Sequence, residues 1–292
     1  MYKLIAIDLD GTLLNSYGEV SSKNKETIKK AIDRGIYVVL CSGRIGSSVE
    51  NLANEVGASY YIIGGNGALV WDRDKKEKLY NKFMDKDLAL KIIQVCEENS
   101  IYYSIMAEGA IIAKNLRYNV LFYNSENANK PAEKKTKINL TQDVYNYIKS
   151  SSFNEFSKIT ICDSNKVIFN SIIHRLRKIN NIEVLDVAHM SRKKIKNGTE
   201  DAEVSYFYTE VTKKNVNKWN AIQFLINKLG IKAEEVMAIG DNTNDKEMIL
   251  NAGLGVVMGN SAPHIKEIGD IIVATNDENG VAEAIEGYAL NG

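Results

Sequence analysis

Two carboxylates one residue apart, Asp8 and Asp10, directly follow the apolar run 4–7 near the start of the chain. Such a run predicts a buried parallel strand, which carries both acids to its carboxyl end, where open α/β sheets bind ligands. An Asp can attack phosphorus as a covalent nucleophile, and a second Asp can donate a proton to the leaving oxygen and later accept one from water. Gly11 would let backbone N–H groups turn inward onto a phosphate. The stretch indicates phosphoryl chemistry; the alternative is a turn whose acids cap a helix or face water.

A second polar stretch, Ser42-Gly43-Arg44, follows the apolar run 36–41. The Ser42 hydroxyl and the neighbouring backbone N–H groups could hold a phosphoryl oxygen at the start of the following helix. The alternative is an ordinary strand-to-helix turn in which Ser42 caps the helix. Taken alone, this stretch favours the cap over the phosphate site.

A third polar stretch at 240–245 follows the apolar run 236–239 and contains Asp241, Asn244 and Asp245. Mg²⁺ prefers oxygen ligands and is commonly bound by one or two carboxylates together with a substrate phosphate. Asp8 and Asp241, at the ends of two strands, would meet that need. A second acid cluster at another strand end makes helix capping the weaker explanation.

A lysine near the start of the predicted helix at 216–229 completes the set, and Lys218 is the candidate. A phosphorus centre that spreads negative charge in the transition state needs a fixed cation besides the metal. Lys218 would also ease the approach of an anionic Asp8 to an anionic phosphate. Lys213 and Lys214 are nearby, and a solvated basic face is the usual interpretation of such a run.

The elements that must position these residues alternate between strand and helix. A helical pattern at 22–34 ends at Gly35 and gives way to the run 36–41, and a second pattern ends at Gly57 before the strand-like run 60–63. Glycine commonly ends helices, and this alternation is typical of a parallel sheet. We therefore expect an α/β fold with a doubly wound parallel sheet.

From about Asp85 the rhythm changes, which indicates an inserted α+β unit. The predicted pieces of the insertion are a helix at 86–99, strand-like runs at 101–106 and 110–114, a long polar loop over 124–140 around Pro131, a strand near 157–162, a helix at 165–179 and a strand near 182–187. The doubly wound pattern returns from Val204. The sequence thus predicts a core of 1–83 with 191–292 and an insertion at 84–190.

The net charge of the chain indicates which classes of binding partner to expect. The chain has 37 basic and 37 acidic side chains and no net charge, which argues against nucleic acid or an anionic membrane as an obligatory partner. The basic runs 130–137 and 192–196 are interpreted as solvated loops. We expect a monomer or a weak homo-oligomer.

The spacing of the cysteines and the shortness of the apolar runs both bear on the cellular compartment of the protein. The chain has an odd number of cysteines, and they are widely spaced: Cys41, Cys96 and Cys162. This pattern does not indicate a set of disulfides and suits buried thiols in a reducing compartment. No window approaches the roughly 18 uninterrupted apolar residues of a membrane span, and the N-terminus enters a strand directly. We expect a cytoplasmic protein without a signal peptide.

The motifs and their order strongly resemble those of the haloacid dehalogenase superfamily of phosphohydrolases. The order is Asp-x-Asp-Gly-Thr at 8–12, Ser-Gly-Arg at 42–44, the helix-borne lysine at 218 and Gly-Asp-x-x-Asn-Asp at 240–245. Within that superfamily the chain is similar to the Cof-type branch, which carries a large α/β cap inserted in the core. Further matches are Gly-Asn-Ser-Ala at 259–262 and the segment 275–281.

The resemblance implies a Mg²⁺-dependent phosphoric monoester hydrolase that acts on small phosphorylated metabolites, with sugar phosphates as the first expectation. It implies that Asp8 is the nucleophile and a metal ligand, that Asp10 is the general acid and base with its backbone carbonyl on the metal, and that Asp241 completes the metal ligands. Lys218 would order Asp8 and the phosphate. The remaining implied residues are Gly11, Ser42, Gly43 and Asn244 toward the phosphate, and Asp245, Arg44 and Asn66 in supporting or substrate-side positions.

The chain departs from the family pattern around Lys218. The family usually has glycine next to this lysine and often another glycine three residues before it, where this chain has Trp219 and Asn215. Two other functions stay open from the residues: a phosphomutase, which transfers the phosphoryl group to another sugar hydroxyl, and a catalytically silent sensor of phosphorylated metabolites. The sensor would not need both a nucleophile and a proton donor.

Overall fold

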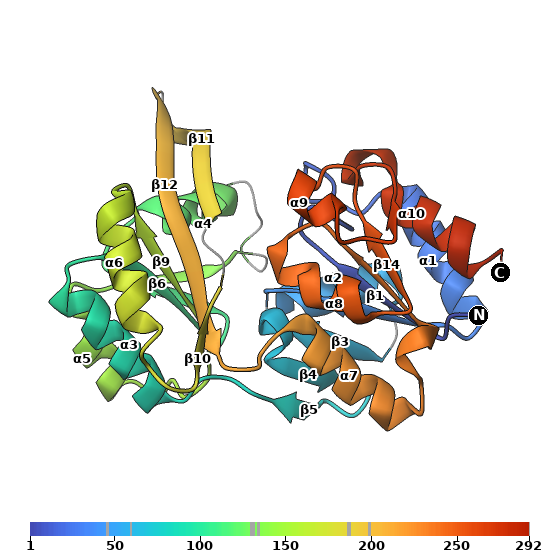
Figure 1. Cartoon of the computed structure of the whole chain (residues 1–292), viewed down its shortest axis with the longest axis horizontal. Coiled ribbons are helices and arrows are strands. Elements are labelled where there is room, and N and C mark those ends of the chain that lie inside the picture. Colours follow the sequence, from blue (N-terminus) through green and yellow to red (C-terminus); the bar gives the residue numbers. More distant parts are fainter. Residues whose placement is uncertain are drawn as a thin grey trace. The chain divides into compact units, whose positions relative to one another are not determined.

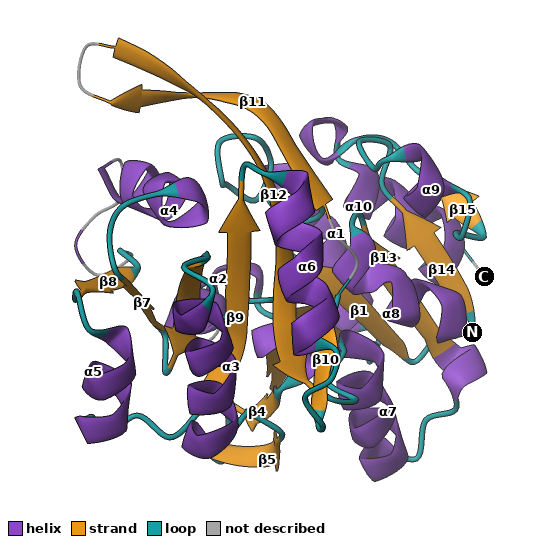
Figure 2. Ribbon diagram, turned by 60° about the vertical axis from the view of Figure 1, so that its left-hand side comes forward, coloured by secondary structure: helices purple, strands orange, loops and turns teal. Residues whose placement is uncertain are grey.

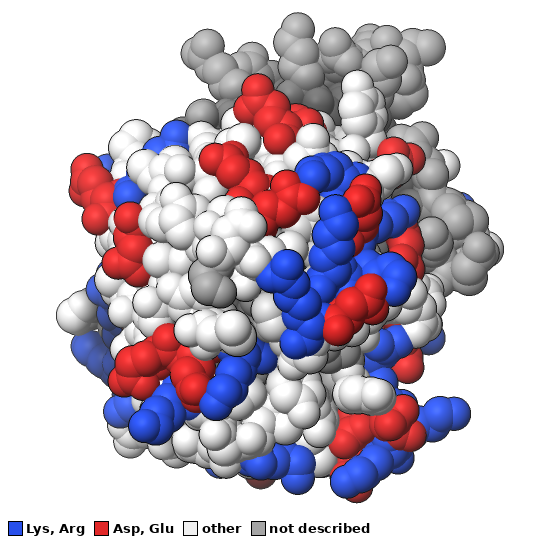
Figure 3. Space-filling model, turned by 90° about the vertical axis from the view of Figure 1, so that its right-hand side faces the viewer, with Lys and Arg blue, Asp and Glu red and all other residues white. Residues whose placement is uncertain are grey.

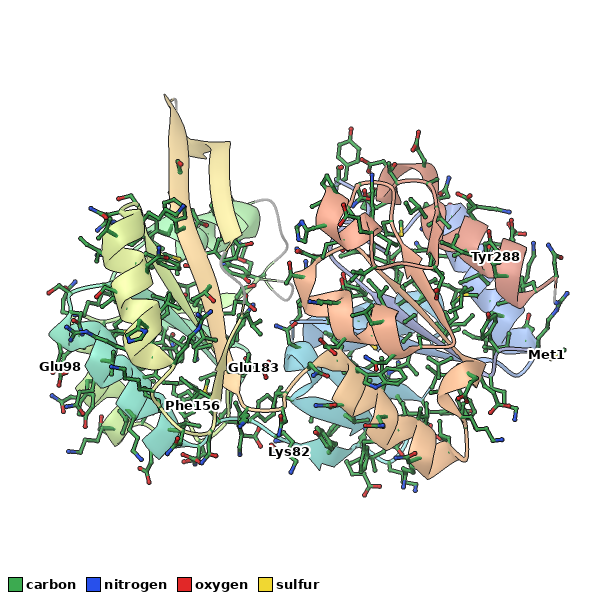
Figure 4. All side chains as sticks on the ribbon, in the orientation of Figure 1. Met1, Lys82, Glu98, Phe156, Glu183 and Tyr288 are labelled. Atoms are coloured by element: carbon green, nitrogen blue, oxygen red, sulfur yellow. The ribbon has the colours of Figure 1, made fainter. Side chains whose placement is uncertain are left out.

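The computed structural model describes residues 1–44, 47–58, 60–128, 132, 135–185, 188–197 and 200–291. The chain forms two compact units (Figure 1). Unit 1 comprises Met1–Lys82 and Val216–Gly292, and unit 2 comprises Phe83–Asn215. Lys82, labelled in Figure 4, is the last residue of the first segment of unit 1.

Unit 1 is built around one sheet. Among the described residues its strands are β1 (Leu4–Asp8), β2 (Tyr37–Cys41), β3 (Tyr61–Gly64), β4 (Leu69–Asp72), β5 (Glu77–Asn81), β13 (Val236–Gly240), β14 (Leu254–Val257) and β15 (Ile271–Ile272). Their order is β15-β14-β13-β1-β2-β3-β4-β5. The strands from β15 to β3 pair in parallel, whereas β4 and β5 form an antiparallel hairpin at one edge. The predicted doubly wound parallel sheet is confirmed.

Helices cover both faces of this sheet, and the alternation of side chains along β1 shows why. Ile5 and Ile7 belong to an apolar cluster with α1 (Ser22–Asp33) and α2 (Ser47–Val56). Leu4 and Ala6 belong to a second cluster with α7 (Lys218–Leu229) and α8 (Lys246–Asn251). Successive side chains of a strand point to opposite faces, so a strand buried on both faces is apolar throughout. Two further helices among the described residues of unit 1 are α9 (Pro263–Lys266) and α10 (Gly280–Ala284).

The register aligns the carboxyl ends of the parallel strands. Ile7 of β1 pairs with Ile239 of β13, and Asp8 pairs with Cys41 of β2. The segments that follow β1, β2 and β13 therefore begin at the same edge of the sheet. This edge receives the three polar stretches singled out in the sequence.

Unit 2 is an α+β unit with its own sheet and core. Its strands are β6 (Tyr102–Ala107), β7 (Ala110–Ala113), β8 (Lys137–Leu140), β9 (Phe156–Asp163), β10 (Ile182–Val184), β11 (Ala188–Asn197) and β12 (Glu200–Lys213), and its helices are α3 (Lys86–Glu98), α4 (Tyr118–Ala128), α5 (Val144–Ser150) and α6 (Lys166–Leu176). The sheet order is β10-β12-β9-β6-β7-β8, with β11 paired to β12. Both α3 and α6 pack against β9 (Figure 2). Phe156, labelled in Figure 4, is fully buried in the core between this sheet and α3, α5 and α6.

The structure differs from the sequence expectation at the end of the insertion. The expected boundary after residue 190 is replaced by one after Asn215, because β12 lies between β10 and β9 in the sheet of unit 2. The doubly wound pattern thus resumes at Val216 and not at Val204. The run 204–211, which is rich in β-branched and aromatic residues, predicts a strand but does not tell which sheet it joins.

The prediction of a polar loop over 124–140 is also partly wrong. The end of α4 occupies its first residues, and β8 occupies its last four. Residues 129–131, 133 and 134 between them, which include Pro131 and part of the basic run 130–137, lie outside the described residues, as do 186 and 187 of the expected strand near 182–187. The side chains of the basic run 192–196 are not described either.

The described surface mixes both signs of charge. On the face drawn in Figure 3, Lys and Arg side chains lie beside Asp and Glu side chains. Three ion pairs of unit 1 are Lys3–Glu235, Lys23–Glu286 and Lys25–Glu55. No described helix is long and apolar enough to cross a membrane.

Candidate active site

A buried lysine between two buried carboxylates forms the centre of the site. Lys218, the first residue of α7, donates hydrogen bonds from Nζ to Asp8 Oδ1 and, at 2.5 Å, to Asp245 Oδ1. Lys218 and Asp245 are completely buried, and Asp8 is 5% exposed. Because Asp8 follows Leu4 and Ala6 in the alternation of β1, its side chain points to the face that α7 covers.

The other oxygen of Asp245 is also occupied. Asp245 Oδ2 accepts hydrogen bonds from the backbone N–H groups of Asp241 and Asn242, both at 3.1 Å. Gly240 makes this possible, since a Cβ at that position would overlap the Asp245 side chain. Asp245 therefore ties the segment after β13 to Lys218.

The Asp241 carboxylate is oriented from the segment after β1. Thr12, which is fully buried, donates a hydrogen bond from Oγ1 to Asp241 Oδ1 at 2.9 Å. Gly11 has φ +84°, a left-handed conformation that favours glycine, and a Cβ there would overlap Asp241 Oδ2. Thr12 belongs to the motif at 8–12, but its contact with Asp241, 229 residues away in the chain, cannot be predicted from that motif alone.

Three of these acids could hold a metal ion. Asp8, Asp241 and Asp245 each offer an oxygen, and these oxygens all lie within 4.8 Å of one another. A set of carboxylate oxygens is the donor chemistry that Mg²⁺ takes. The cluster contains Asp8 and Asp241 of the expected metal ligands, whereas the Asp10 carboxylate lies outside it.

Burial and mutual repulsion shift the pKa values of these neighbouring acids. Burial raises the pKa of Asp8 well above its usual range, and the charge of Asp245 adds to this while Lys218 opposes it. Burial and the charge of Asp245 raise the pKa of Asp241 to about 6. Burial alone would lower the pKa of Lys218, but the charges of Asp245 and Asp8 outweigh it and raise that pKa. With three acids around one lysine, a bound cation would favour the ionised carboxylates.

Asp10 lies apart from this buried group. Its side chain is 57% exposed and pairs with Arg44, whose Nε donates to Asp10 Oδ2 at 2.8 Å and whose second nitrogen contacts Oδ1. The structure thus brings together two of the residues expected near the substrate. Both carboxylate oxygens of Asp10 therefore contact Arg44.

Three of the residues expected at the phosphate, Ser42, Gly43 and Asn244, lie near one another around Asn66. Ser42 is 1% exposed, and its Oγ accepts a hydrogen bond from the Arg44 backbone N–H at 3.0 Å. The Asn66 backbone N–H donates to the Ser42 carbonyl at 2.9 Å, and Asn244 Nδ2 donates to Asn66 Oδ1 at 3.1 Å. A Cβ at Gly43 would lie 2.8 Å from Asn66 Oδ1. Segments after β2, β3 and β13 therefore meet here.

The departures from the family pattern around Lys218 have structural explanations. Asn215 has φ +62°, and Asn tolerates this left-handed conformation better than other non-glycine residues. Trp219 is 8% exposed and packs in the apolar cluster between the sheet and α7. Asn217 caps α7 by accepting a hydrogen bond from the Asn220 backbone N–H at 2.8 Å. Asn215 and Trp219 are thus compatible with a helix that presents Lys218 to Asp8.

The fold thus places three acids at the carboxyl edge of a doubly wound sheet, with a lysine from α7 beside them. The family model for haloacid dehalogenase-like hydrolases matches residues 5–285. The chain belongs to this family, and the predicted membership in the haloacid dehalogenase superfamily is confirmed.

Curated relatives match over nearly the whole chain. The Phosphatase YwpJ of Bacillus subtilis (strain 168) is 31% identical over 288 residues, which are 97% of this chain and 99% of the relative. The 5-amino-6-(5-phospho-D-ribitylamino)uracil phosphatase YcsE of the same organism is 32% identical, over 99% of this chain and 96% of the relative.

A solved structure of a haloacid dehalogenase-like hydrolase from B. subtilis resembles the chain with a TM-score of 0.77 and 26% identity, covering 98% of this chain and 99% of the other. A haloacid dehalogenase-like hydrolase from Bacteroides thetaiotaomicron gives a TM-score of 0.75 and 29% identity, with coverage of 98% and 99%. The family and the relatives together make the protein an enzyme, a phosphatase of the haloacid dehalogenase family.

Proposed function

We propose that the enzyme hydrolyses small phosphomonoesters, sugar phosphates above all, in a Mg²⁺-dependent reaction that passes through an aspartyl-phosphate. The observation that carries the proposal is the contact between Asp8 and Lys218. A buried carboxylate at a strand end, held by a buried ammonium group, combines a nucleophile with a fixed cation for the phosphoryl group.

In the first step an oxygen of Asp8 forms a bond to phosphorus while the bond from phosphorus to the leaving oxygen breaks. Asp10 gives its proton to that oxygen, so the product leaves as an alcohol. Lys218 keeps Asp8 oriented and balances the charge on the phosphoryl oxygens.

In the second step Asp10 takes a proton from water, whose oxygen bonds to phosphorus as the bond to Asp8 breaks. Inorganic phosphate leaves, and Asp8 regains its carboxylate. Gly11, Ser42, Gly43 and Asn244 would border the phosphoryl oxygens through this cycle, with Arg44 and Asn66 on the substrate side. Asp245 would keep Lys218 in place.

Asp8, Asp241 and the Asp10 backbone carbonyl would hold the Mg²⁺ ion. When bound, the ion supplies positive charge that lowers the repulsion between an anionic nucleophile and an anionic phosphate. Exhaustive treatment with a chelator should therefore abolish phosphate release, and added Mg²⁺ should restore it. Ca²⁺ should inhibit, because its larger and looser coordination misplaces the reacting groups. Full activity after chelation contradicts the role given to Asp241.

Sugar phosphates are the first substrates to test. The YcsE relative is named for a substrate that carries its phosphate on a ribityl chain, which is a sugar alcohol. This name supports phosphorylated sugars and polyols as the class for the present enzyme. A screen of phosphorylated metabolites that includes this compound would rank the candidates.

The test of the mechanism is the substitution Asp8→Asn. The amide is nearly the same size as the carboxylate but is a poor nucleophile and a poor metal ligand, so turnover should be lost while the fold stays intact. Phosphate release and circular dichroism measure the two effects. A variant that keeps more than a few per cent of the activity would show the covalent mechanism to be wrong.

The same assay separates the remaining functions. A hydrolase releases phosphate from a sugar phosphate whether or not a second sugar is present. A mutase needs an acceptor hydroxyl and yields a new sugar phosphate.

A further inference from the structure

Two asparagines from late loops of unit 1 hold the segment that follows the nucleophile. Asn260, after β14, donates a hydrogen bond from Nδ2 to the Gly11 carbonyl at 2.8 Å. Asn276, after β15, donates from Nδ2 to the Leu14 carbonyl at 2.9 Å. Both belong to sequence motifs, 259–262 and 275–281, to which the proposed reaction gives no role.

The two asparagines are also joined to each other. Asn260 Oδ1 accepts a hydrogen bond from the Asn276 backbone N–H at 3.0 Å. Beyond them, Asp277 accepts from the backbone N–H of Ser16 at 2.8 Å and from its Oγ at 2.6 Å. The segment 11–16 is therefore held at three points by two loops more than two hundred residues away in the sequence. We call Asn260 and Asn276 the asparagine clamp.

The clamp holds a peptide group next to the acids that could bind a metal ion. Asn260 fixes the carbonyl of the Gly11–Thr12 peptide, and Thr12 is the residue whose hydroxyl orients Asp241. Gly11 itself packs on Asp241 with no room for a Cβ. A rotation of this peptide would move the Thr12 hydroxyl and the Gly11 backbone against the Asp241 carboxylate. The proposed metal ligands Asp8 and Asp241 would both still be present, but their carboxylates would no longer be held in the same relative positions.

We propose that Asn260 is a positioning residue that sets metal affinity and turnover by fixing the Gly11–Thr12 peptide. This inference rests on the proposed function, since it takes Asp8 and Asp241 as metal ligands. The bond between Asn260 and Gly11 is exposed to solvent. Exposed hydrogen bonds contribute little net stability, because water replaces a lost partner. Its contribution is therefore to geometry, as expected of partners that orient metal ligands.

The decisive variant is Asn260→Asp. Asp has the same shape and keeps an oxygen for the Asn276 N–H, but it cannot donate to the Gly11 carbonyl. The matched control is Asn251→Asp, because Asn251 is exposed and its Nδ2 likewise donates to a backbone carbonyl, that of Glu247, at 2.7 Å, with the Glu247 carboxylate at 3.5 Å. Asn260→Ala serves as a second variant, without the added charge, and it also covers a failure of the first to fold.

Binding of Mn²⁺ to the metal-free protein, measured by calorimetry, is the first readout, and kcat and KM for an aryl phosphate are the second. Both Asn260 variants should bind Mn²⁺ about tenfold or more weakly, the effect typical of lost partners of metal ligands. Their kcat should fall by a similar factor with little change in KM. The Tm should shift no more than in the Asn251→Asp control.

Unchanged Mn²⁺ affinity and unchanged kcat in both Asn260 variants overturn the clamp while leaving the proposed function intact. A loss of Tm with normal Mn²⁺ affinity also overturns it, because the role of Asn260 is then purely structural. A wild-type protein that neither binds Mn²⁺ nor releases phosphate overturns the proposed function, and the inference with it.

Discussion

Asp10 differs from the other acids of the site because its side chain is exposed to solvent. Asp8 and Asp245 are buried against Lys218, whereas the Asp10 side chain is 57% exposed and pairs with Arg44. An exposed side chain can turn toward a substrate, and this mobility suits a group that exchanges protons with an alcohol and then with water. The proposed nucleophile, which is buried, and the proposed proton carrier, which is exposed, are thus separated by one residue.

The substitution Asp10→Asn tests this role. General acid catalysis typically contributes about a hundred- to ten-thousandfold in rate, and the leaving oxygen of a sugar needs the proton far more than that of an aryl phosphate. We expect kcat to fall by about that range for a sugar phosphate and much less for p-nitrophenyl phosphate. Equal losses for both substrates, measured side by side, would count against Asp10 as the acid.

At the scale of elements, the first turn of α7 decides where Lys218 lies. Asn217 caps the helix, and Gly67, in the segment after β3, packs directly on it. A Cβ at Gly67 would overlap the Asn217 carbonyl, and Gly67 has φ +95°, which favours glycine. The close approach of these two backbones fixes the start of the helix against the sheet.

We predict that Gly67→Ala displaces the start of α7 and with it Lys218. The change should cost about 1–2 kcal/mol for the left-handed backbone and further stability for the overlap, with a large loss of kcat. The control is Gly35→Ala, because Gly35 has φ +80° with nothing within 4 Å of its Cβ position. Urea denaturation and kcat should show a stability loss in both variants but a loss of kcat only at Gly67. Normal turnover in Gly67→Ala would disprove this role.

At the scale of the whole molecule, each unit has its own apolar core. Within the described ranges, the clusters on the two faces of the first sheet consist only of residues of unit 1, and the main cluster around α3, α5 and α6 consists only of residues of unit 2. Every group that the proposed chemistry uses belongs to unit 1. We propose that unit 2 acts as the cap that excludes water and recognises the leaving group.

Replacing residues 83–215 by a short flexible linker tests the division of labour. The remaining unit 1 should fold, as circular dichroism can show, and should keep weak activity toward a small aryl phosphate. It should lose most of its activity and selectivity toward sugar phosphates, because recognition of the leaving group is removed with unit 2. Full selectivity in such a variant would place specificity in the loops of unit 1.

The sequence by itself determined the sheet of unit 1 and the edge where the chemistry lies. Strands buried on both faces must be apolar throughout, and polar residues directly after them must reach the carboxyl ends, so Asp8, Ser42 and Asp241 could be placed from local pattern alone. The glycines after the helical patterns marked where those helices end. The order of the motifs then sufficed to predict the family.

The tertiary structure alone decided which strand joins which sheet and which side chains meet. The run 204–211 predicts a strand in either unit, and only its pairing with β9 and β10 assigns it to unit 2. The meeting of Asp245 with Lys218, and of Asn260 with Gly11, depends on hydrogen bonds between segments distant in the chain. Local pattern reports on backbone conformation and burial, whereas such contacts are fixed by the packing of whole elements, and no neighbouring residue encodes them.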